Sequence, residues 1–304
     1  MTKTNLECKE TGIRLDVFIS DNSGRDYSRS FYKRLITNGL VTVNGKTASK
    51  AGIVLDKGDK VEVDFPEPEN SDNIPQDIPL DIVYEDSDLL VINKPQGMVV
   101  HPAAGHHEGT LVNALLSHCG GELSDINGVI RPGIVHRIDK DTSGLMLACK
   151  NNETHLALAD MLSRHEIVRE YRALVYGVIS EERGTVDAPI GRSSSDRKKM
   201  AVIKDGKSAV THFTVVKRYA EATDLLLKLE TGRTHQIRVH MGYIGHPVLG
   251  DPVYSARRPK YGLEGQALHS CSITFVHPRT GETMHFEAPV PDYYLEALNS
   301  LTPL

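Results

Sequence analysis

Ten residues near the middle of the chain, 136–145, place two aspartates, two hydroxyl groups, several bases and a glycine between two apolar runs. Polar groups in this density do not suit a core, and an ordinary turn needs only an aspartate and a Ser-Gly pair. His136, Arg137 and Asp139 come just before the expected turn, which contains Ser143, and residues at the end of a strand commonly face a cleft. We therefore take Asp139 as the candidate for chemistry and expect a strand on each side of the segment.

The composition is that of a globular protein with two domains. The chain has 304 residues, of which 39% are hydrophobic and 25% charged, and this length exceeds that of an average domain. The four cysteines are far apart, which favours reduced thiols. The charged first residues do not resemble a signal peptide, and no apolar run reaches the roughly 20 residues of a membrane span. We expect a soluble, cytoplasmic monomer without a membrane partner.

The net charge of −5 originates in one short segment. Residues 66–90 hold eight acidic and no basic residues, whereas residues 1–65 hold 11 basic and nine acidic ones. The parts outside the acidic segment are therefore neutral or slightly basic. A nucleic-acid partner remains compatible with the overall negative charge, because a binding face can be basic when the whole protein is not.

The first 65 residues have the pattern of a compact unit in which helices precede strands. Two helices are expected, the second over residues 28–38, and an alternating segment at 40–46 contains the Asn-Gly pair of a hairpin. Basic side chains accompany the second helix and the hairpin: Arg25, Arg29, Lys33, Arg34 and Lys46. On composition alone, a solvated face explains them as well as RNA binding does.

This segment also resembles the S4-like RNA-binding domain, or αL motif. The matching residues are Arg14-Leu15-Asp16, Ser28-Arg29-Ser30, Ile36-x-x-Gly39-x-Val41-x-Val43-Asn44-Gly45-Lys46 and Gly58-Asp59. The resemblance implies that the basic second helix binds RNA. We expect this domain to span residues 1–66, an acidic linker to span 67–79, and a second domain to span 80–304.

In the second domain, expected strands outnumber expected helices and no regular βαβ alternation is visible. This pattern predicts an α+β fold with a large, mostly antiparallel mixed sheet flanked by helices and loops.

Spacing gives no support for a metal or an organic cofactor. None of the 14 histidines belongs to a paired cluster, although a metal site usually shows such pairing. The His-Pro pairs at 101, 246 and 277 look like turns. Neither a nucleophilic serine motif nor a nucleotide-binding glycine motif occurs.

One carboxylate with basic neighbours remains. Arg238 lies just inside an expected helix, and an ion pair with Asp139 would keep that carboxylate ionised and fixed. Such an aspartate could attack a carbon or abstract a proton. From spacing alone, a structural salt bridge between two loops is the commoner outcome.

The central segment closely resembles the motif HRLDxxTSGL of the RluA/RluD-type RNA pseudouridine synthases, with Ile138 in place of Leu. Further motifs of this family follow in order: Asn93-Lys94-Pro95-x-Gly97, Val100-His101-Pro102, Glu170-Tyr171-Arg172-Ala173, Gly232-Arg233-Thr234-His235-Gln236-Ile237-Arg238-Val239-His240 and His269-x-x-x-Ile273-x-Phe275-x-His277-Pro278. The family usually has lysine where this chain has Arg169, which keeps the charge.

The resemblance implies a role for each matching residue. Asp139 would be the catalytic carboxylate that breaks the uridine glycosidic bond, Tyr171 would stack under the flipped uracil, and Arg238 would pair with Asp139. Arg137 would enter the space that the flipped base leaves, because a stacked uridine cannot be reached in place. Support for the pocket would come from the other motif residues: His136, Thr142, Ser143, Gly144, Arg233, His235 and Gln236. No cofactor and no metal is implied.

The N-terminal domain and the segment His101-Pro102-Ala103-Ala104-Gly105 resemble the branch that modifies large-subunit ribosomal RNA. Two alternatives stay open: the same chemistry on transfer RNA, and a non-catalytic RNA-binding factor for ribosome assembly. The sequence does not identify the modified uridines, nor does it distinguish free RNA from a precursor particle.

Overall fold

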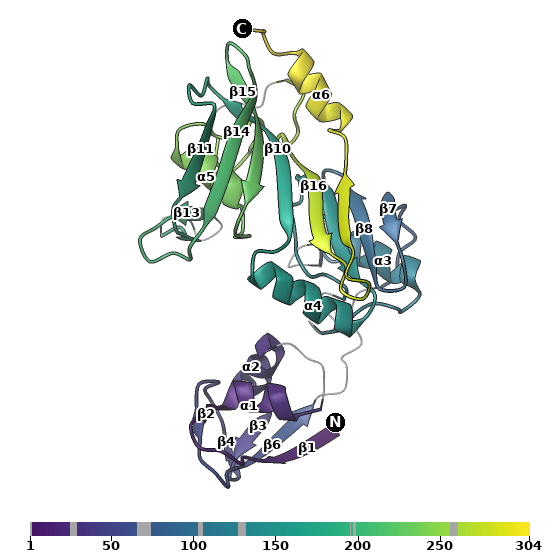
Figure 1. The fold of residues 1–304 in the computed structure, drawn as a ribbon, viewed down its shortest axis with the longest axis vertical. Helices are drawn as coiled ribbons and strands as arrows, with labels where there is room; N and C mark the ends of the chain where they lie inside the picture. The colour runs from purple at the N-terminus through teal and green to yellow at the C-terminus, as the bar shows by residue number, and fades with distance from the viewer. Residues whose placement is uncertain are drawn as a thin grey trace. The chain divides into compact units, whose positions relative to one another are not determined.

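The computed structural model describes residues 2–24, 29–65, 74–102, 106–126, 132–194, 196, 199–255 and 261–304 (Figure 1). The chain divides into two compact units. The first comprises Met1–Ile78, His101–Val135 and Cys149–Ala157, and the second comprises Pro79–Val100, His136–Ala148 and Leu158–Leu304. No helix in the described ranges has both the length and the apolar character needed to cross a membrane.

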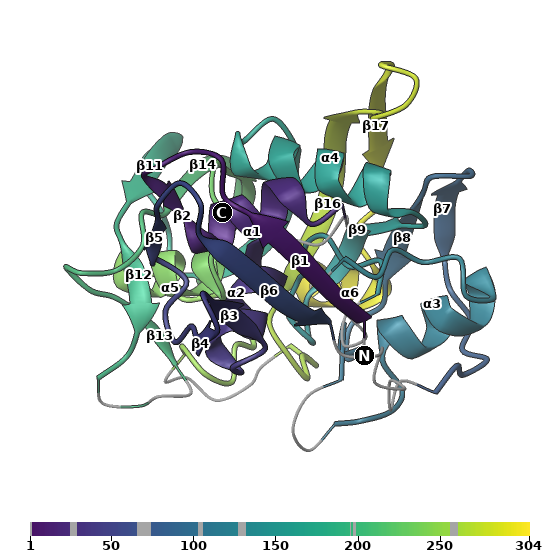
Figure 2. The same ribbon diagram turned by 90° about the horizontal axis from the view of Figure 1, so that it is seen from below.

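The N-terminal part of the first unit is a small sheet covered by two helices. Its elements are β1 (Thr2–Glu7), β2 (Ile13–Arg14), α1 (Leu15–Asn22), α2 (Arg29–Thr37), β3 (Val41–Val43), β4 (Lys46–Thr47), β5 (Val54–Leu55) and β6 (Lys60–Phe65). The sheet has the order β1-β6-β3-β4, and β1 lies beside β6 in both views (Figures 1 and 2). No sequence pattern predicts β1, because its residues are mostly polar, as suits an edge strand with one face in solvent.

The helix α2 begins and ends close to the expected positions. Tyr32, Leu35 and Ile36 lie on its buried face and pack into one core with α1 and the strands. Burial at positions i, i+3 and i+4 is the amphipathic pattern of a surface helix. Ser28, the first residue of the expected helix, lies outside the described residues. The Asn-Gly hairpin is confirmed by the pairing of β3 with β4.

A nine-stranded sheet forms the framework of the second unit. Its strands are β7 (Ile82–Glu85), β8 (Leu89–Lys94), β9 (Ser143–Cys149), β10 (Val168–Tyr176), β11 (Arg183–Asp187), β14 (Val210–Arg218), β15 (Ala222–Leu229), β16 (Leu268–Val276) and β17 (Thr283–Glu287). Their order is β11-β14-β15-β10-β16-β9-β8-β7, with β17 also on β16. Apart from the parallel pair of β9 with β16, the registers resolved in the described strands are antiparallel. The α+β prediction is confirmed.

The remaining elements are short. They are the hairpin β12 (Ile190–Arg192) and β13 (Met200–Val202), and the helices α3 (Leu111–Cys119), α4 (Asn152–Ser163), α5 (Gln236–Tyr243) and α6 (Asp292–Asn299). The Thr110 side chain caps α3 by accepting a hydrogen bond from the Asn113 N–H. The Asn113 side chain in turn accepts a hydrogen bond from the Thr110 backbone N–H. Such a capping box satisfies N–H groups that a helix start leaves unpaired.

The surroundings of the central segment differ from the prediction in two respects. Residues 132–142 form turns and irregular backbone, with a single β-bridge residue at Ile134, so the described residues 132–135 before the segment contain no strand. The apolar run there is short and starts at Gly133, which has φ +71°. Ser143 does not lie in a turn, because it is the buried first residue of β9. Asp139 therefore lies in a loop that enters the middle of the sheet.

Candidate active site

Asp139 and Arg238 meet although 99 residues separate them. Asp139 is the first residue of a turn in which its carbonyl accepts a hydrogen bond from the Thr142 N–H, at 3.1 Å. Arg238 lies in the first turn of α5. The guanidinium Nη1 donates to Asp139 Oδ2 at 2.8 Å. The Arg238 side chain is 5% exposed and the Asp139 side chain 16%, so the arginine is buried while the carboxylate remains within reach of a substrate.

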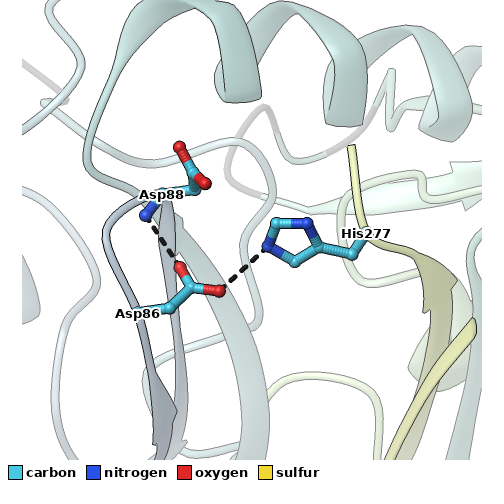
Figure 3. A group of neighbouring side chains, drawn as sticks. All are labelled: Asp86, Asp88 and His277. Atoms are coloured by element: carbon cyan, nitrogen blue, oxygen red, sulfur yellow. Dashed lines mark hydrogen bonds and ion pairs between the residues drawn. The ribbon is translucent and has the colours of Figure 1, made fainter. Parts of the chain in front are cut away.

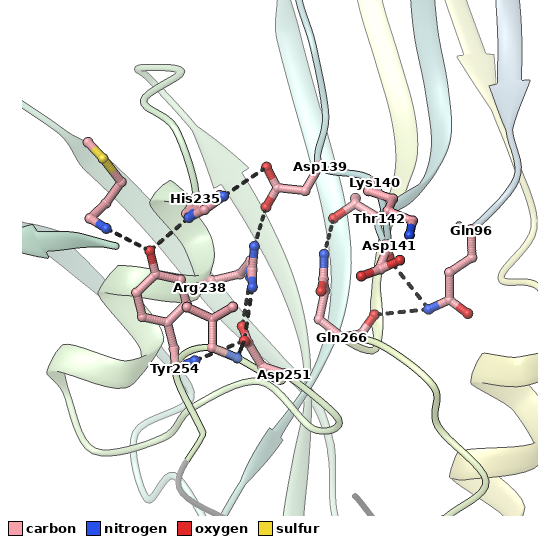
Figure 4. A network of polar contacts seen from close by, with 12 residues as sticks. Gln96, Asp139, Lys140, Asp141, Thr142, His235, Arg238, Asp251, Tyr254 and Gln266 are labelled. Carbon is pink, nitrogen blue, oxygen red and sulfur yellow. Dashed lines mark hydrogen bonds and ion pairs between the residues drawn. The ribbon is translucent and has the colours of Figure 1, made fainter. Parts of the chain in front are cut away.

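A second carboxylate, Asp251, holds the other side of Arg238 (Figure 4). Arg238 donates through Nε and Nη2 to the two oxygens of Asp251, at 2.7 and 2.9 Å. Asp251 Oδ1 also accepts the N–H groups of Val253 and Tyr254. Burial alone would raise the pKa of Asp251, but these donors and the guanidinium charge hold it below its usual value. The two carboxylates likewise raise the pKa of Arg238 against the effect of burial. Their hydrogen bonds also fix the orientation of the planar guanidinium group.

His235 places an imidazole on the free side of Asp139. It precedes α5 in a left-handed conformation (φ +57°), and its Nε2 is 3.8 Å from Asp139 Oδ1. Its Nδ1 is 2.7 Å from the hydroxyl of Tyr254, which accepts the Met200 N–H at 2.9 Å. Burial is the main cause that lowers the pKa of His235. A neutral ring that accepts the Tyr254 proton at Nδ1 would direct its own N–H at the carboxylate.

Buried polar contacts hold the loop that carries Asp139. Lys94, which is fully buried, donates to the carbonyls of Pro95, Met98 and Lys140 at 2.7, 2.9 and 3.0 Å. Burial lowers the pKa of Lys94 to about 7, against the attraction of Asp141 and Asp139. The carbonyl of Lys140, next to Asp139, is thereby fixed.

On the other side of this loop, the Gln266 amide donates to Thr142 Oγ1 at 3.1 Å, and Gln96 donates to the Asp141 carbonyl at 3.2 Å (Figure 4). Thr142 is buried. Its hydroxyl therefore serves the loop rather than a ligand.

Ser143 and Gly144 join β9 to β16. Ser143 Oγ is 2.8 Å from His269 Nδ1 and 2.8 Å from the Tyr293 hydroxyl. Gly144 has φ +107°, and a Cβ there would be 2.2 Å from the carbonyl oxygen of Ser270. Only glycine permits this approach of the two strands, so the Ser-Gly pair of the motif has a structural use.

Arg233 and Gln236 fix the start of α5. The Gln236 side chain accepts from the Arg233 N–H and from Thr231 Oγ1, and it donates to the Val210 carbonyl, at 2.7 to 3.0 Å. Arg233 Nε donates to the Ser208 carbonyl at 2.9 Å. These contacts set the position of the turn that carries His235 and Arg238.

His136 and Arg137, neighbours in sequence, have different surroundings. His136 Nε2 accepts the Leu147 N–H at 2.9 Å, so its ring proton is on Nδ1. Burial, and then the charge of Arg169, lower the pKa of His136 to about 3. Arg137 is exposed.

Tyr171 lies in β10 and is 5% exposed. Burial is the first cause that raises its pKa, and the charge of Asp139 acts in the same direction, while Arg169 opposes both. Tyr171 is therefore a neutral phenol close enough to Asp139 to be influenced by its charge.

The predicted RNA-binding residues of the first unit differ in what they contact. Lys33, Arg34 and Lys46 are exposed. Lys33 Nζ is also 3.7 Å from the buried carboxylate of Asp16. Arg29 begins α2, but its side chain is not described, and Arg25 lies outside the described residues.

Sequence reasoning missed a group formed by Asp86, Asp88 and His277 (Figure 3). Within the described ranges these are the residues that could hold a metal ion, since their ligand atoms lie within 4.8 Å of one another. Asp86 Oδ2 is 2.9 Å from His277 Nε2, and Arg279 pairs with Asp88. Arg279 already supplies a positive charge, so the group connects the β7–β8 turn to the end of β16. No spacing rule predicts a contact across 191 residues.

The chain matches the family model described as RNA pseudouridylate synthase over residues 88–243, and the S4 domain model over residues 13–61. It is 52% identical to the Bacillus subtilis protein named uncharacterized RNA pseudouridine synthase YlyB, over 95% of this chain and 94% of the relative. It is 48% identical to ribosomal large subunit pseudouridine synthase D of Zymomonas mobilis, over 92% and 91% of the two chains. Among solved structures, human RNA pseudouridylate synthase domain containing 1 aligns with a TM-score of 0.59 and 27% identity, over 74% of this chain and 89% of that one.

Proposed function

The chain belongs to the RNA pseudouridylate synthase family, and from this membership we propose that it isomerises uridines of large-subunit ribosomal RNA, with Asp139 as the catalytic carboxylate. The observation that carries the assignment of Asp139 is its 2.8 Å bond to Arg238, itself clamped by Asp251. The names of several relatives, which designate large-subunit ribosomal enzymes, support the choice of substrate.

The reaction exchanges one bond of the nucleoside for another. The bond between N1 of uracil and C1′ of ribose breaks, the base turns, C5 bonds to C1′, and the C5 proton is lost to solvent while N1 gains one. Asp139 would start this sequence by adding to C1′, by adding to C6 of the base, or by removing a sugar proton. A carboxylate fixed in place by Arg238 suits all three.

Tyr171 would stack on the uracil after the nucleotide has left the RNA helix. Its phenol is neutral, so it can lie against a base without adding charge. Arg137, exposed two residues before Asp139, would occupy the place that the base vacates.

The S4 domain binds RNA, and we propose that α2 and the β3–β4 hairpin form its RNA-binding surface. Lys33, Arg34 and Lys46 would contact phosphates, and each contact would add to the salt dependence of binding. We keep residues 1–66 as this domain, 67–79 as a linker and 80–304 as the catalytic domain. A ribosomal substrate also implies a cytoplasmic enzyme, for which we expect a monomer.

Tritium release from C5-labelled uridine in ribosomal and transfer RNA transcripts tests the proposal. We expect release from the ribosomal transcript, and a fall on the order of 10⁴-fold for Asp139→Asn, with RNA binding retained. Asp160→Asn makes the same chemical change on an exposed carboxylate of α4 and should keep full activity. Release from transfer RNA alone would contradict the substrate assignment.

The assembly-factor alternative makes a different prediction for the same variant. If binding alone were the function, Asp139→Asn would leave cell growth and the ribosome profile unchanged. If neither transcript releases tritium with the wild-type enzyme, precursor particles of the large subunit are the next substrate to assay.

A further inference from the structure

Arg169 lies beside Tyr171 on one face of β10. Side chains of a strand alternate between its faces, and burial along β10 follows this alternation, with Arg169, Tyr171 and Ala173 buried. Glu170 and Arg172 are on the other face, where Arg172 pairs with Asp224. Arg169 is 6% exposed, so its guanidinium occupies the interior next to the tyrosine.

The guanidinium of Arg169 lacks a partner within the described part of the chain. Its Nε is buried without a hydrogen-bond acceptor, and no carboxylate of the described residues forms an ion pair with it. Buried polar groups are almost always hydrogen-bonded, and an unpaired buried charge costs several kcal/mol. Such a group suggests a ligand with acceptor oxygens, one that carries negative charge at some stage.

The groups around Arg169 indicate where this ligand lies. The charge of Arg169 lowers the pKa of His136 and opposes the rise in the pKa of Tyr171, so both side chains are near it. The charge of Asp139 contributes to the rise in the pKa of Tyr171. On its other side, a Cβ at Gly232 would be 3.0 Å from Arg169 Nη1, so the backbone leading to His235 passes directly under the guanidinium. His136 and Tyr171 are both neutral and cannot supply the missing anion.

We propose that Arg169 is a catalytic residue that donates hydrogen bonds to the ring oxygens of the substrate uracil while negative charge develops on them. This inference rests on the proposed function, since it requires uracil to lie against Tyr171. A preorganised donor of this kind lowers a barrier because it costs no reorganisation when the charge appears.

Each route open to Asp139 places negative charge on the uracil. When the N1–C1′ bond breaks, both bonding electrons stay with N1, and the charge spreads to O2 and O4. The electron deficiency at C1′ is met by a bond from Asp139 or by loss of a sugar proton to it. When Asp139 instead adds to C6, the C5–C6 double bond yields its electrons to an enolate on O4. Arg169 faces charged ring oxygens in all these cases.

The test compares uridine with 5-fluorouridine at the target position under single-turnover conditions, in wild type, Arg169→Met and Arg169→Lys. Loss of the starting nucleoside is followed by mass spectrometry of digested RNA. Fluorine stabilises the uracil anion by itself, so Arg169 should matter less for that substrate. We expect Arg169→Met to lose about 100- to 1,000-fold on uridine and at least about tenfold less on 5-fluorouridine, with Arg169→Lys in between because it keeps the charge.

Three outcomes would overturn the inference. Equal losses on both RNAs would mean that Arg169 acts on structure alone. A loss that appears in the RNA dissociation constant and not in the single-turnover rate would assign Arg169 to a phosphate. Full activity of Arg169→Met would dismiss any role. Wild-type enzyme that turns over neither RNA, whether as a transcript or within precursor particles of the large subunit, would instead contradict the proposed function itself. Thermal unfolding of each variant checks the fold, and Arg169→Lys remains informative if Arg169→Met does not fold.

Discussion

Two buried arginines of the second unit, Arg238 and Arg169, have opposite surroundings. Arg238 pairs with Asp139 and with Asp251, so one positive charge meets two negative ones. Arg169 is about as deeply buried, yet its Nε has no partner. The first arginine is satisfied before any substrate arrives, whereas the second has its donors unused.

The difference separates two tasks that one residue type can perform. An arginine clamped from both sides is rigid, and it orients Asp139 as the supporting residue of a functional group should. An arginine without a partner destabilises the free protein, and such a cost is typical of sites that receive charge from a ligand. Unfolding measurements can therefore distinguish the two arginines before any RNA is added.

The largest expected effect on stability is that of Arg238→Met. Removal of the guanidinium leaves two carboxylates, one of them fully buried, without their counter-charge. Breaking a buried pair in this way costs about 3–5 kcal/mol of unfolding free energy, measured by urea denaturation at neutral pH. A loss below about 1 kcal/mol would mean that water replaces the guanidinium, and the two arginines would then be less different than their contacts indicate.

The next effect concerns His136, whose pKa is lowered to about 3 by burial and by Arg169. Unfolding restores the usual pKa of about 6.5, so the unfolded chain binds more protons between these values. The contribution of neutral His136 to stability is complete above about pH 6.5 and is lost as the pH falls toward 3. Between pH 7 and about 4.5 we expect about 2 kcal/mol of loss from this group.

Denaturation of His136→Gln isolates the contribution, because the glutamine amide can still accept the Leu147 N–H. Its acid sensitivity should be smaller than that of wild type by the amount given. In Arg169→Met the pKa of His136 should rise, which reduces the same loss. An unchanged acid sensitivity of His136→Gln would show that His136 does not contribute to the loss. An unchanged acid sensitivity of Arg169→Met alone would show that the Arg169 charge does not affect the ring.

A smaller effect of opposite sign is expected when Arg169→Met is compared with Arg238→Met. Methionine removes an unpaired charge and fills a similar volume, so unfolding free energy should rise by about 1 kcal/mol. Urea denaturation of the two variants in parallel gives the sign directly. If Arg169→Met destabilises the protein by 3 kcal/mol or more, then Arg169 has a partner in the native state and the contrast fails.

Local patterns predicted helices and hairpins of this protein, but not the contacts across the chain. The amphipathic pattern over residues 28–38 placed α2 within one residue of its bounds, and the Asn-Gly pair placed the β3–β4 hairpin, because these signals lie within a few positions. The parallel pairing of β9 with β16 joins segments that are 126 residues apart at Ser143 and His269. No period within a strand encodes such a pairing.

The site shows the same limit. The polar residues of the central segment indicated Asp139, Arg238 was its expected partner, and the role of Tyr171 came from the motif resemblance. Whether the ion pair between Asp139 and Arg238 was catalytic or structural stayed open. Asp251, the second carboxylate that binds Arg238, was not predicted. It lies 13 residues after Arg238 and directly follows a glycine. The sequence also could not predict that Arg169 Nε lacks a hydrogen-bond partner, since the absence of a partner depends on the fold.

Gly232→Ala tests the comparison with the smallest change. The new Cβ would approach Arg169 Nη1 to 3.0 Å, so the guanidinium must shift by a few tenths of an ångström, which a flexible side chain can do at little cost. Stability should change by less than about 0.5 kcal/mol. The rate should nevertheless fall by about three- to tenfold, because catalytic donors act only within a narrow range of positions.

Gly245→Ala, in the turn after α5 where a Cβ meets no atom within 4 Å, controls for backbone strain, since its φ of +86° makes it the more destabilising change. A Gly232→Ala enzyme with wild-type single-turnover rate would mean that the exact place of Arg169 is immaterial, and would leave Arg238 as the one arginine on which the chemistry depends.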